Sequence, residues 1–355
     1  MTDAVVLHFP TARKAPPLTY QPSETRHGNL NWRRAGTSGL TLPEFSFGLW
    51  QKFGDRTPYE TQREILLAAF DAGITHFDIA NRYGPPARAA EKNFGRLLRE
   101  DLAAWREEIV ISTKAGNPIS ASPYHRGGSR KNLLQSLDHS LKDLGVDYVD
   151  VFYSHSPDLA VPLEETVGAL VSAVHSGKAL YVGISNYSKE RAHQAAVLLK
   201  EAGVPLVLHQ PRYSIFDRRV EIEDILGQSA ADGVGLITYS PLAQGLLTDK
   251  YLDGGVPAGA RAENSDFLSV DDITDEYRSR VSALNDLARE RGQSLAQLAL
   301  QWVLRRPEVT TALIGASSVE QLHHNLQAPG FAALTDEELK IIDAHGVHGT
   351  GLRTK

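Results

Sequence analysis

The sequence predicts an α/β protein that folds as a closed (β/α)8 TIM barrel, with an N-terminal hairpin, a long loop after the seventh strand and an extra C-terminal helix. Two observations support this fold. Short apolar, strand-like runs alternate with segments of helical periodicity, and strands separated by helices pair in parallel. The alternation occurs eight times, the number that closes a barrel, whereas open doubly wound sheets usually have about five or six strands. No G-x-G-x-x-G follows any strand-like run, which argues against a Rossmann-type sheet.

The expected elements follow one another in a regular order. Residues 1–30 are rich in Pro, Thr and Arg without periodicity, so we expect an extended or disordered arm, followed by a single domain over residues 31–355. Gly36 and Gly39 separate two short strand-like pieces and predict a hairpin. The eight strands are expected at 45–50, 75–80, 108–114, 148–155, 179–185, 206–210, 234–240 and 311–316. The helices are expected at 60–72, 88–100, 129–144, 163–176, 189–202, 220–232, 276–305 with a break at Gly292, and 318–327.

Two segments depart from this alternation. Residues 242–274 have no clear periodicity, and a loop of this length in a compact domain is usually a lid or a binding loop. Residues 335–345 predict an additional helix, because Thr335 and Glu338 have the spacing of a capping box.

Composition excludes several classes of function. A net charge of −6 without a long basic run argues against a nucleic-acid partner. The chain contains no cysteine, which excludes disulfides, thiolate catalysis and zinc–cysteine sites. No run of about 18 apolar residues is present to span a membrane. We therefore expect a cytoplasmic protein; the sequence leaves its oligomeric state open, a homo-oligomer included.

Polar side chains gather where the predicted strands end. In barrels of this kind the active site lies at the C-terminal ends of the strands. The residues found there are Asp78 and Tyr83, Lys114, His155, Ser185 and Asn186, Gln210, Tyr239 and Ser240, and Gly315 and Ser317. If the barrel closes, all of them face one mouth.

Four of these residues suggest acid catalysis. Asp78 and Lys114 belong to neighbouring strands, so we expect an ion pair that offsets the free-energy cost of burying the carboxylate. A nearby ammonium should stabilise the phenolate of Tyr83 and lower its pKa, which would make this tyrosine a usable proton donor. His155 is expected to hydrogen-bond a substrate oxygen from the other side. Such a site is suited to carbonyl reduction.

Six motifs resemble the aldo-keto reductase family in sequence and in order: "FDIANRYG", "STKAG", "YSHSPD", "GISNYS", "HQPRYS" and "YSPLAQGLL". The resemblance covers about residues 33–345 and is nearest to the branch of bacterial glyceraldehyde-3-phosphate reductases and potassium-channel β subunits. It implies a catalytic tetrad of Asp78, Tyr83, Lys114 and His155, with Tyr83 as general acid. It also implies NADPH as the hydride donor.

The resemblance further implies the residues that bind the cofactor. Tyr239 would stack on the nicotinamide, whose carboxamide would be held by Ser185, Asn186 and Gln210. The residues implied for the phosphates are Ser240, Pro241, Leu242, Gln244, Gly245 and Leu246, with Lys250 and Arg261. Those implied for the adenosine end are Gly315, Ser317, Gln321 and Asn325. Trp50 is expected either to form part of the cofactor and substrate pocket or to pack at the barrel top.

The sequence also departs from the family pattern. Asp249 stands where the branch usually has Gly, and His324 where an acidic residue usually contacts adenine, so the choice of cofactor stays open. Lys250 and Arg261 have a second interpretation as ordinary solvated charges. The histidine pairs near the C-terminus lack a carboxylate at ligand spacing, so we expect no metal site.

Three functions compete. We expect reduction of small aldehydes such as glyceraldehyde 3-phosphate or methylglyoxal; the rival is a non-catalytic, NADPH-binding, redox-sensing subunit of a membrane channel. His155 favours the enzyme, because channel subunits usually have Asn there. A phosphate-binding barrel isomerase fits worse, since it needs a general-base Glu.

The loop after the third strand suggests an anionic substrate. It places Tyr124 and Arg126 near the mouth, and the following helix would offer its first N–H groups to a phosphate or carboxylate. The alternative is a loop that covers the barrel with solvated charges.

Overall fold

Eight parallel strands close into a barrel in the computed structural model, which describes residues 20–252 and 268–351. The order of neighbouring strands is β10, β3, β4, β5, β6, β7, β8 and β9. Their bounds are β3 (Phe45–Gly48), β4 (His76–Asp78), β5 (Val110–Ala115), β6 (Val149–Ser154), β7 (Ala179–Ser185), β8 (Leu206–Gln210), β9 (Gly235–Tyr239) and β10 (Val309–Ile314). Each lies within or overlaps an expected strand, so the predicted (β/α)8 barrel is confirmed.

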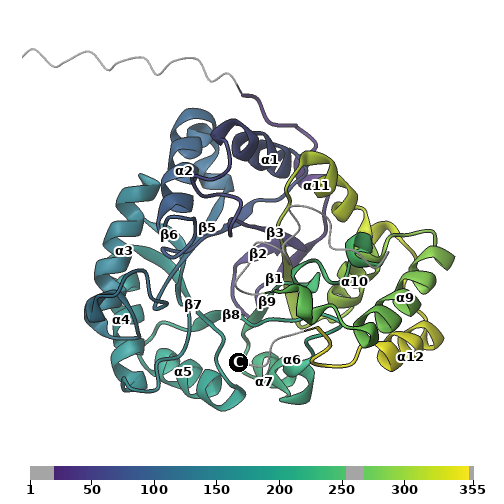
Figure 1. Cartoon of the computed structure of the whole chain (residues 1–355). Helices are drawn as coiled ribbons and strands as arrows, with labels where there is room; N and C mark the ends of the chain where they lie inside the picture. Colours follow the sequence, from purple (N-terminus) through teal and green to yellow (C-terminus); the bar gives the residue numbers. More distant parts are fainter. Residues whose placement is uncertain (1–19, 253–267, 352–355) are drawn as a thin grey trace, which may run out of the picture.

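Helices surround the barrel (Figure 1). They are α1 (Tyr59–Asp71), α2 (Ala89–Leu97), α3 (Arg130–Leu144), α4 (Leu163–His175), α5 (Lys189–Glu201), α6 (Arg219–Ile222), α7 (Ile225–Ala231), α9 (Asp275–Glu290), α10 (Leu295–Leu304), α11 (Val319–Leu326) and α12 (Asp336–His345). The expected break at Gly292 is confirmed, with φ of 69°. The single helix expected at 220–232 is wrong, because Asp224 adopts a left-handed φ of 53° and separates α6 from α7. None of the described helices is long and apolar enough to cross a membrane.

The predicted hairpin closes the bottom of the barrel. Strands β1 (Trp32–Arg34) and β2 (Thr41–Pro43) pair antiparallel, and the turn between them lies against the segment that precedes β9. Gly36 has φ of 56°, and a Cβ there would lie 2.0 Å from the carbonyl oxygen of Gly233. Only glycine combines this conformation with so close an approach. The C-terminal ends of the strands therefore lie at the end of the barrel opposite the hairpin.

The barrel interior is divided into an apolar and a polar part. Its apolar cluster includes Val151, Tyr153, Leu208, Ile237 and Leu313 from β6, β8, β9 and β10. Its polar part consists of Ser46, His76, Ser112 and Thr311, all fully buried, from β3, β4, β5 and β10. The tetrad lies above this polar part.

The segment that precedes the hairpin is packed against the barrel helices. The hydroxyl of Tyr20 donates to Asp71 Oδ1 at 2.8 Å, at the end of α1. The guanidinium of Arg26, which is buried, pairs with Glu108 at 2.5 Å. Residues 20–30 of the expected N-terminal arm are therefore ordered against the barrel; the rest of that arm lies outside the described residues.

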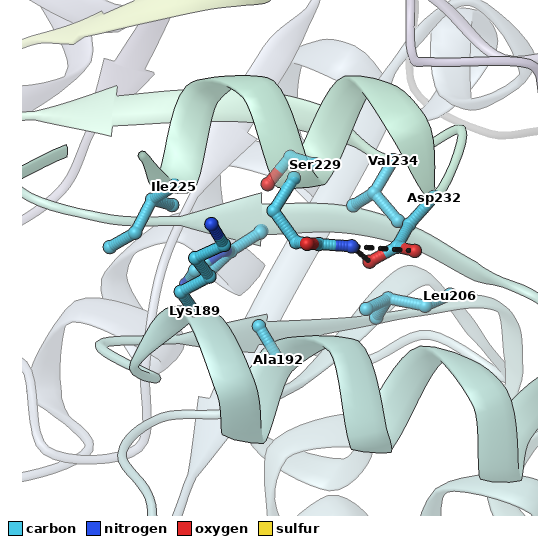
Figure 2. A pocket seen from close by; sticks show the side chains of 9 residues that line it. Lys189, Ala192, Leu206, Ile225, Ser229, Asp232 and Val234 are labelled. Carbon is cyan, nitrogen blue, oxygen red and sulfur yellow. Dashed lines mark hydrogen bonds between the residues drawn. The ribbon is translucent and has the colours of Figure 1, made fainter. Parts of the chain in front are cut away.

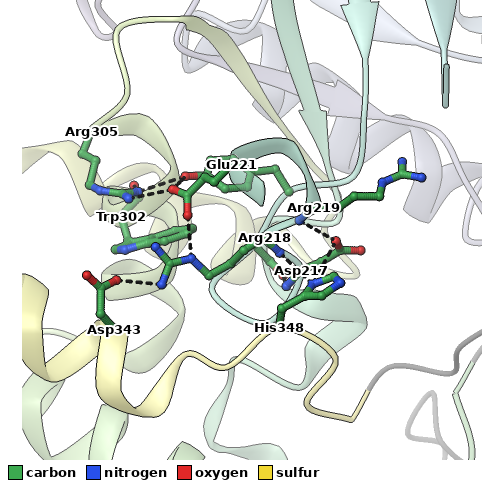
Figure 3. Close-up of polar contacts among 10 residues, drawn as sticks. Asp217, Arg218, Arg219, Glu221, Trp302, Arg305, Asp343 and His348 are labelled. Atoms are coloured by element: carbon green, nitrogen blue, oxygen red, sulfur yellow. Dashed lines mark hydrogen bonds and ion pairs between the residues drawn. The ribbon is translucent and has the colours of Figure 1, made fainter. Parts of the chain in front are cut away.

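The extra C-terminal helix is held by a network of ion pairs (Figure 3). Arg218, which precedes α6, donates to Glu221 at 2.6 Å and to Asp343 of α12 at 2.7 Å. Arg305 at the end of α10 donates to Glu221 at 3.0 Å. The guanidinium carbons of Arg305 and Arg218 lie 3.9 Å and 5.3 Å from the ring centre of Trp302. Ion pairs and cation–π contacts thus connect α6, α10 and α12. The predicted helix at 335–345 is confirmed.

The long loop after β9 is described in part. It contains the short 3-10 helices η5 (Ala243–Gly245), η6 (Asp249–Tyr251) and η7 (Val270–Asp272). Residues 253–267 lie outside the described part.

Candidate active site

Asp78, Lys114 and Tyr83 meet at the mouth of the barrel. Asp78 and Lys114 are fully buried and form an ion pair between adjacent strands, as expected. The ammonium of Lys114 donates to Asp78 Oδ2, to the carbonyl oxygen of Ile79 at 2.8 Å and to the hydroxyl of Tyr83 at 3.4 Å. These contacts use all three ammonium hydrogens. Because the oxygen of Tyr83 accepts from Lys114, its own hydrogen remains available to a substrate.

The second carboxylate oxygen of Asp78 also accepts hydrogen bonds. Oδ1 accepts hydrogen bonds from Ser112 Oγ at 2.6 Å and from Gln210 Nε2 at 3.1 Å. A buried carboxylate with donors on both oxygens avoids the cost of an unpaired charge. Ser112 is not among the predicted site residues, although its position two residues before Lys114 on the same strand indicates that it faces the same side.

Two aromatic rings flank the ammonium. Lys114 Nζ lies 5.0 Å from the ring centre of Tyr83 and 5.7 Å from that of Tyr153. Burial lowers the pKa of Lys114, and the charge of Asp78 opposes that change. The ring of Tyr153 needs a glycine opposite, since a Cβ at Gly183 would lie 2.3 Å from it.

The expectation that Lys114 lowers the pKa of Tyr83 is wrong in this structure. Burial raises the pKa of Tyr83 well above its usual 10, and the negative charge of Asp78 raises it further. The reason is that burial removes the water that would solvate a phenolate, and the carboxylate of Asp78 repels its negative charge. Tyr83 therefore keeps its proton at neutral pH, which is the form that a general acid needs.

His155 completes the tetrad as a neutral imidazole. Its ring centre lies 5.8 Å from that of Tyr83, and the two rings are nearly perpendicular. Burial lowers the pKa of His155 well below 6.5, as do the charges of Lys114 and Arg82. Its Nδ1 has no hydrogen-bond partner within the described residues. Arg82, an exposed cation directly before Tyr83, is not among the predicted site residues.

The predicted carboxamide-binding residues form one network beside the tetrad. Ser185 Oγ donates to the carbonyl oxygen of Gln210 at 2.8 Å, and Asn186 Nδ2 donates to that of His155 at 3.0 Å. The hydroxyl of Tyr239 donates to Asn186 Oδ1 at 2.7 Å. Tyr239, Ser185, Asn186 and Gln210 are thus brought together at the ends of β7, β8 and β9. Gln210, expected on the cofactor, donates one of the two hydrogens of its side-chain amide to Asp78.

Backbone strain concentrates at the same mouth. Left-handed φ angles occur at Gln51 (62°), Asn186 (64°), Ser240 (55°), Ala243 (45°) and Gln244 (62°), in the loops after β3, β7 and β9. Such angles cost a non-glycine residue about 1–3 kcal/mol and are common in binding sites. The strain supports a binding role for the loop that contains Ser240, Pro241, Leu242, Gln244, Gly245 and Leu246.

The charged end of that loop is described only in part. Lys250 is exposed in η6, beside the exposed Asp249, and its backbone N–H is capped by Thr248. Arg261 lies outside the described residues.

The predicted adenosine-binding residues gather at α11, which follows β10. Ser317 donates from both its N–H and its hydroxyl to Gln321 Oε1, at 2.8 Å and 3.0 Å. Asn325 is buried, and its Nδ2 has no acceptor in the described part of the chain. Gly315 is exposed, and the nearest atom to a Cβ there would be 3.7 Å away. A buried amide without an acceptor and an open glycine fit a dinucleotide. His324 instead contacts Ser294 at 2.9 Å.

Protein groups occupy part of the expected anion site at the start of α3. The N–H of Gly128 donates to Asp158 and that of Arg130 to Glu165, both at 2.9 Å. Two of the N–H groups at this end are thus paired with carboxylates, and an anion site here stays a prediction. Tyr124, Arg126 and the half-buried Trp50 remain candidates for substrate contact, with Tyr124 60% exposed.

A small cavity on the outside of the barrel is not part of this site. It lies between α5 and α7 (Figure 2), where Gln228 hydrogen-bonds Asp232. Its volume is about 10 Å³, room for one water at most. His209 lines it and has no hydrogen-bond partner among the described residues at either ring nitrogen.

Comparison with known proteins agrees with this geometry. Residues 44–347 match the aldo/keto reductase family. The chain is 51% identical over 336 residues to L-glyceraldehyde 3-phosphate reductase of Escherichia coli K12, covering 94% of this chain and 97% of the relative. It is 36% identical over 304 residues to a probable voltage-gated potassium channel subunit beta of Oryza sativa subsp. japonica, and 38% identical over 306 residues to one of Arabidopsis thaliana, covering 84% of this chain and 91% of the relative in both cases. Enzymes of this family generally use NAD(P)H. The chain belongs to the aldo/keto reductase family and is an oxidoreductase.

Proposed function

We propose that this protein reduces small aldehydes, of the glyceraldehyde 3-phosphate or methylglyoxal type, to alcohols with NADPH. The observation that carries the proposal is the contact of Lys114 with Tyr83: the ammonium donates to the hydroxyl oxygen at 3.4 Å, and no acceptor among the described residues takes the hydrogen of that hydroxyl. The similarity to an L-glyceraldehyde 3-phosphate reductase supports the substrate class.

The residues divide the work of carbonyl reduction. NADPH would supply a hydride to the carbonyl carbon of the substrate. Tyr239, Asn186 and Gln210 would hold the nicotinamide of the cofactor. Tyr83 donates its proton to the carbonyl oxygen, and Lys114 stabilises the phenolate that remains. Neutral His155 donates a hydrogen bond to the same oxygen. Asp78 keeps Lys114 charged, and the phenolate recovers its proton from solvent at the mouth.

Removing the acid tests this assignment. Tyr83→Phe should lower kcat by about 10²-fold or more, the scale of general acid catalysis, without weakening cofactor binding. Tyr153→Phe is the matched control, because it removes another buried phenol whose oxygen has no hydrogen-bond partner in the described structure. Aldehyde reduction by Tyr83→Phe at the wild-type rate would show that another group supplies the proton.

The preference for NADPH over NADH is assigned to Lys250 and Arg261. A 2′-phosphate forms charge-assisted hydrogen bonds that NADH cannot form. Titrations that follow tryptophan fluorescence should show that Arg261→Ala and Lys250→Ala weaken NADPH much more than NADH. Arg280→Ala is the control, since this residue pairs with Glu276 on α9. An equal loss of affinity for both cofactors would show that the two residues do not bind the 2′-phosphate.

A non-catalytic redox-sensing subunit of a membrane channel is the second candidate, supported by the similarity to channel β subunits. The complete tetrad with His155 favours the enzyme. Repeated turnover with excess aldehyde supports the enzyme, whereas a single oxidation of bound NADPH supports the sensor. A cytoplasmic location and a homo-oligomeric state stay predictions.

A further inference from the structure

A continuous line of buried hydrogen bonds runs around the inside of the barrel and ends on the tetrad. Thr311 Oγ1 lies 2.8 Å from Ser46 Oγ, which lies 2.8 Å from His76 Nδ1. His76 Nε2 lies 3.0 Å from Ser112 Oγ, which donates to Asp78 Oδ1 at 2.6 Å. All five side chains are fully buried, on the adjacent strands β10, β3, β4 and β5.

The donors and acceptors in this line can be assigned by elimination. A carboxylate only accepts, so the single hydrogen of Ser112 Oγ goes to Asp78. Ser112 must then accept from His76, which places the imidazole hydrogen on Nε2. A neutral imidazole carries one hydrogen, so Nδ1 accepts from Ser46, and Ser46 in turn accepts from Thr311. Each hydrogen bond therefore points towards Asp78.

We propose that His76 and Ser112 are positioning residues of the tetrad: the one-way line of hydrogen bonds holds Asp78 in the rotamer, and in the ionised state, that Lys114 requires. The proposal rests on the function proposed above. Hydrogen bonds that point the same way polarise one another in a low dielectric, and the last of them stabilises the charged form of the carboxylate. The second donor on the same oxygen, Gln210, comes from the predicted cofactor pocket.

His76 meets the requirement that it stay neutral. Burial lowers its pKa from 6.5 to about 4, and the charges of Asp78 and Lys114 act in opposite directions on it. The titratable groups that face Asp78 inside the barrel are Lys114, His76, Tyr83 and Tyr153. A protonated His76 would add a hydrogen on Nδ1 and reverse its bond to Ser46.

The direction of the line can be measured without any enzyme assay. In ¹⁵N-labelled protein, the His76 ring should show a protonated Nε2 and an unprotonated Nδ1, unchanged as the pH falls through the usual histidine range; the His76→Gln variant assigns the signals. Ser46→Ala should shift Nδ1 alone, because it removes only the donor to that nitrogen. A hydrogen on Nδ1, or titration of His76 near its usual pKa of about 6.5, would overturn the proposal.

Kinetics test what the line does for the tetrad. Ser112→Ala should lower kcat by about 10-fold while leaving cofactor affinity intact, because a hydrogen bond to a charged group is lost.

Thr113→Ala is the matched control on the same strand. Thr113 is as buried as Ser112 and also donates to a carboxylate, Glu91 at 2.6 Å, but on the outer face of the barrel. It should leave both kcat and cofactor affinity unchanged. If Ser112→Ala and Thr113→Ala lower kcat by the same factor, the line does not position Asp78. If the wild-type protein reduces no aldehyde, the proposed function fails, and the NMR result still decides the direction of the line.

Discussion

Replacing Glu91 with glutamine should stabilise the protein at neutral and alkaline pH but not at acidic pH. Glu91 lies on α2, fully buried behind β5, where its carboxylate accepts a hydrogen bond from Thr113. Burial raises the pKa of Glu91 from its ordinary value of 4.5 to about 7. No arginine or lysine in the described structure forms an ion pair with it.

The sign and the size of the effect follow from this difference in pKa. The folded state binds the proton more tightly than the unfolded state, so the free energy of unfolding falls as the pH rises from 4.5 to about 7 and stays low above that. The difference between 4.5 and about 7, at about 1.4 kcal/mol per pH unit, amounts to roughly 3 kcal/mol. Glutamine does not ionise, so the Glu91→Gln variant should not lose this stability as the pH rises.

Urea unfolding followed by circular dichroism, repeated from about pH 4.5 to about pH 8, measures the difference between the variant and wild type. The difference in the free energy of unfolding should shift by up to about 3 kcal/mol in favour of the variant over that range. A cost of the buried amide that does not depend on pH would not alter this shift. Glu201→Gln is the control, since Glu201 is exposed at the end of α5. A difference between Glu91→Gln and wild type that does not change with pH would refute the reasoning.

Two other variants test separate features of the site. Gly183→Ala should destabilise the fold by about 1–3 kcal/mol, because its Cβ would overlap the ring of Tyr153; thermal unfolding measures this, and an unchanged melting temperature would mean that the ring moves aside without cost. Arg82→Ala should raise KM for glyceraldehyde 3-phosphate several-fold more than KM for an uncharged aldehyde, with a weaker salt dependence, because its charge lies beside the tetrad. If Arg126→Ala shows this selective effect and Arg82→Ala does not, the anion contacts the loop after β5 instead.

Periodicity was sufficient to predict the barrel, because each strand and helix has its own apolar pattern and the number of strands decides closure. The split between α6 and α7 could not be predicted, since Asp224 adopts a left-handed conformation that a chain tolerates only when tertiary contacts impose it.

For the site, the sequence indicates which side chains lie at the mouth of the barrel but not their hydrogen-bond partners. Strand ends and motifs indicate which side chains face the mouth, and Asp78 and Lys114 form the expected pair. They do not indicate which partner satisfies each donor. The N–H groups at the start of α3 looked available for an anion, but Asp158 and Glu165 come from another part of the chain. The pKa of Tyr83 likewise depends on burial and on the nearby charge of Asp78, which only three-dimensional packing sets.

The contacts of residues 20–30 decide where the chain can be shortened or fused. A truncation that starts at residue 31, where the sequence alone would place the domain boundary, removes the donors that pair with Asp71 and Glu108. It also removes the guanidinium of Arg26, which lies 5.2 Å from the ring centre of Phe70. A truncation that starts at Tyr20 keeps all of these contacts. Affinity tags and fusion partners should therefore be joined before Tyr20, and products of limited proteolysis that begin after Arg26 should melt at a lower temperature than those that begin before it.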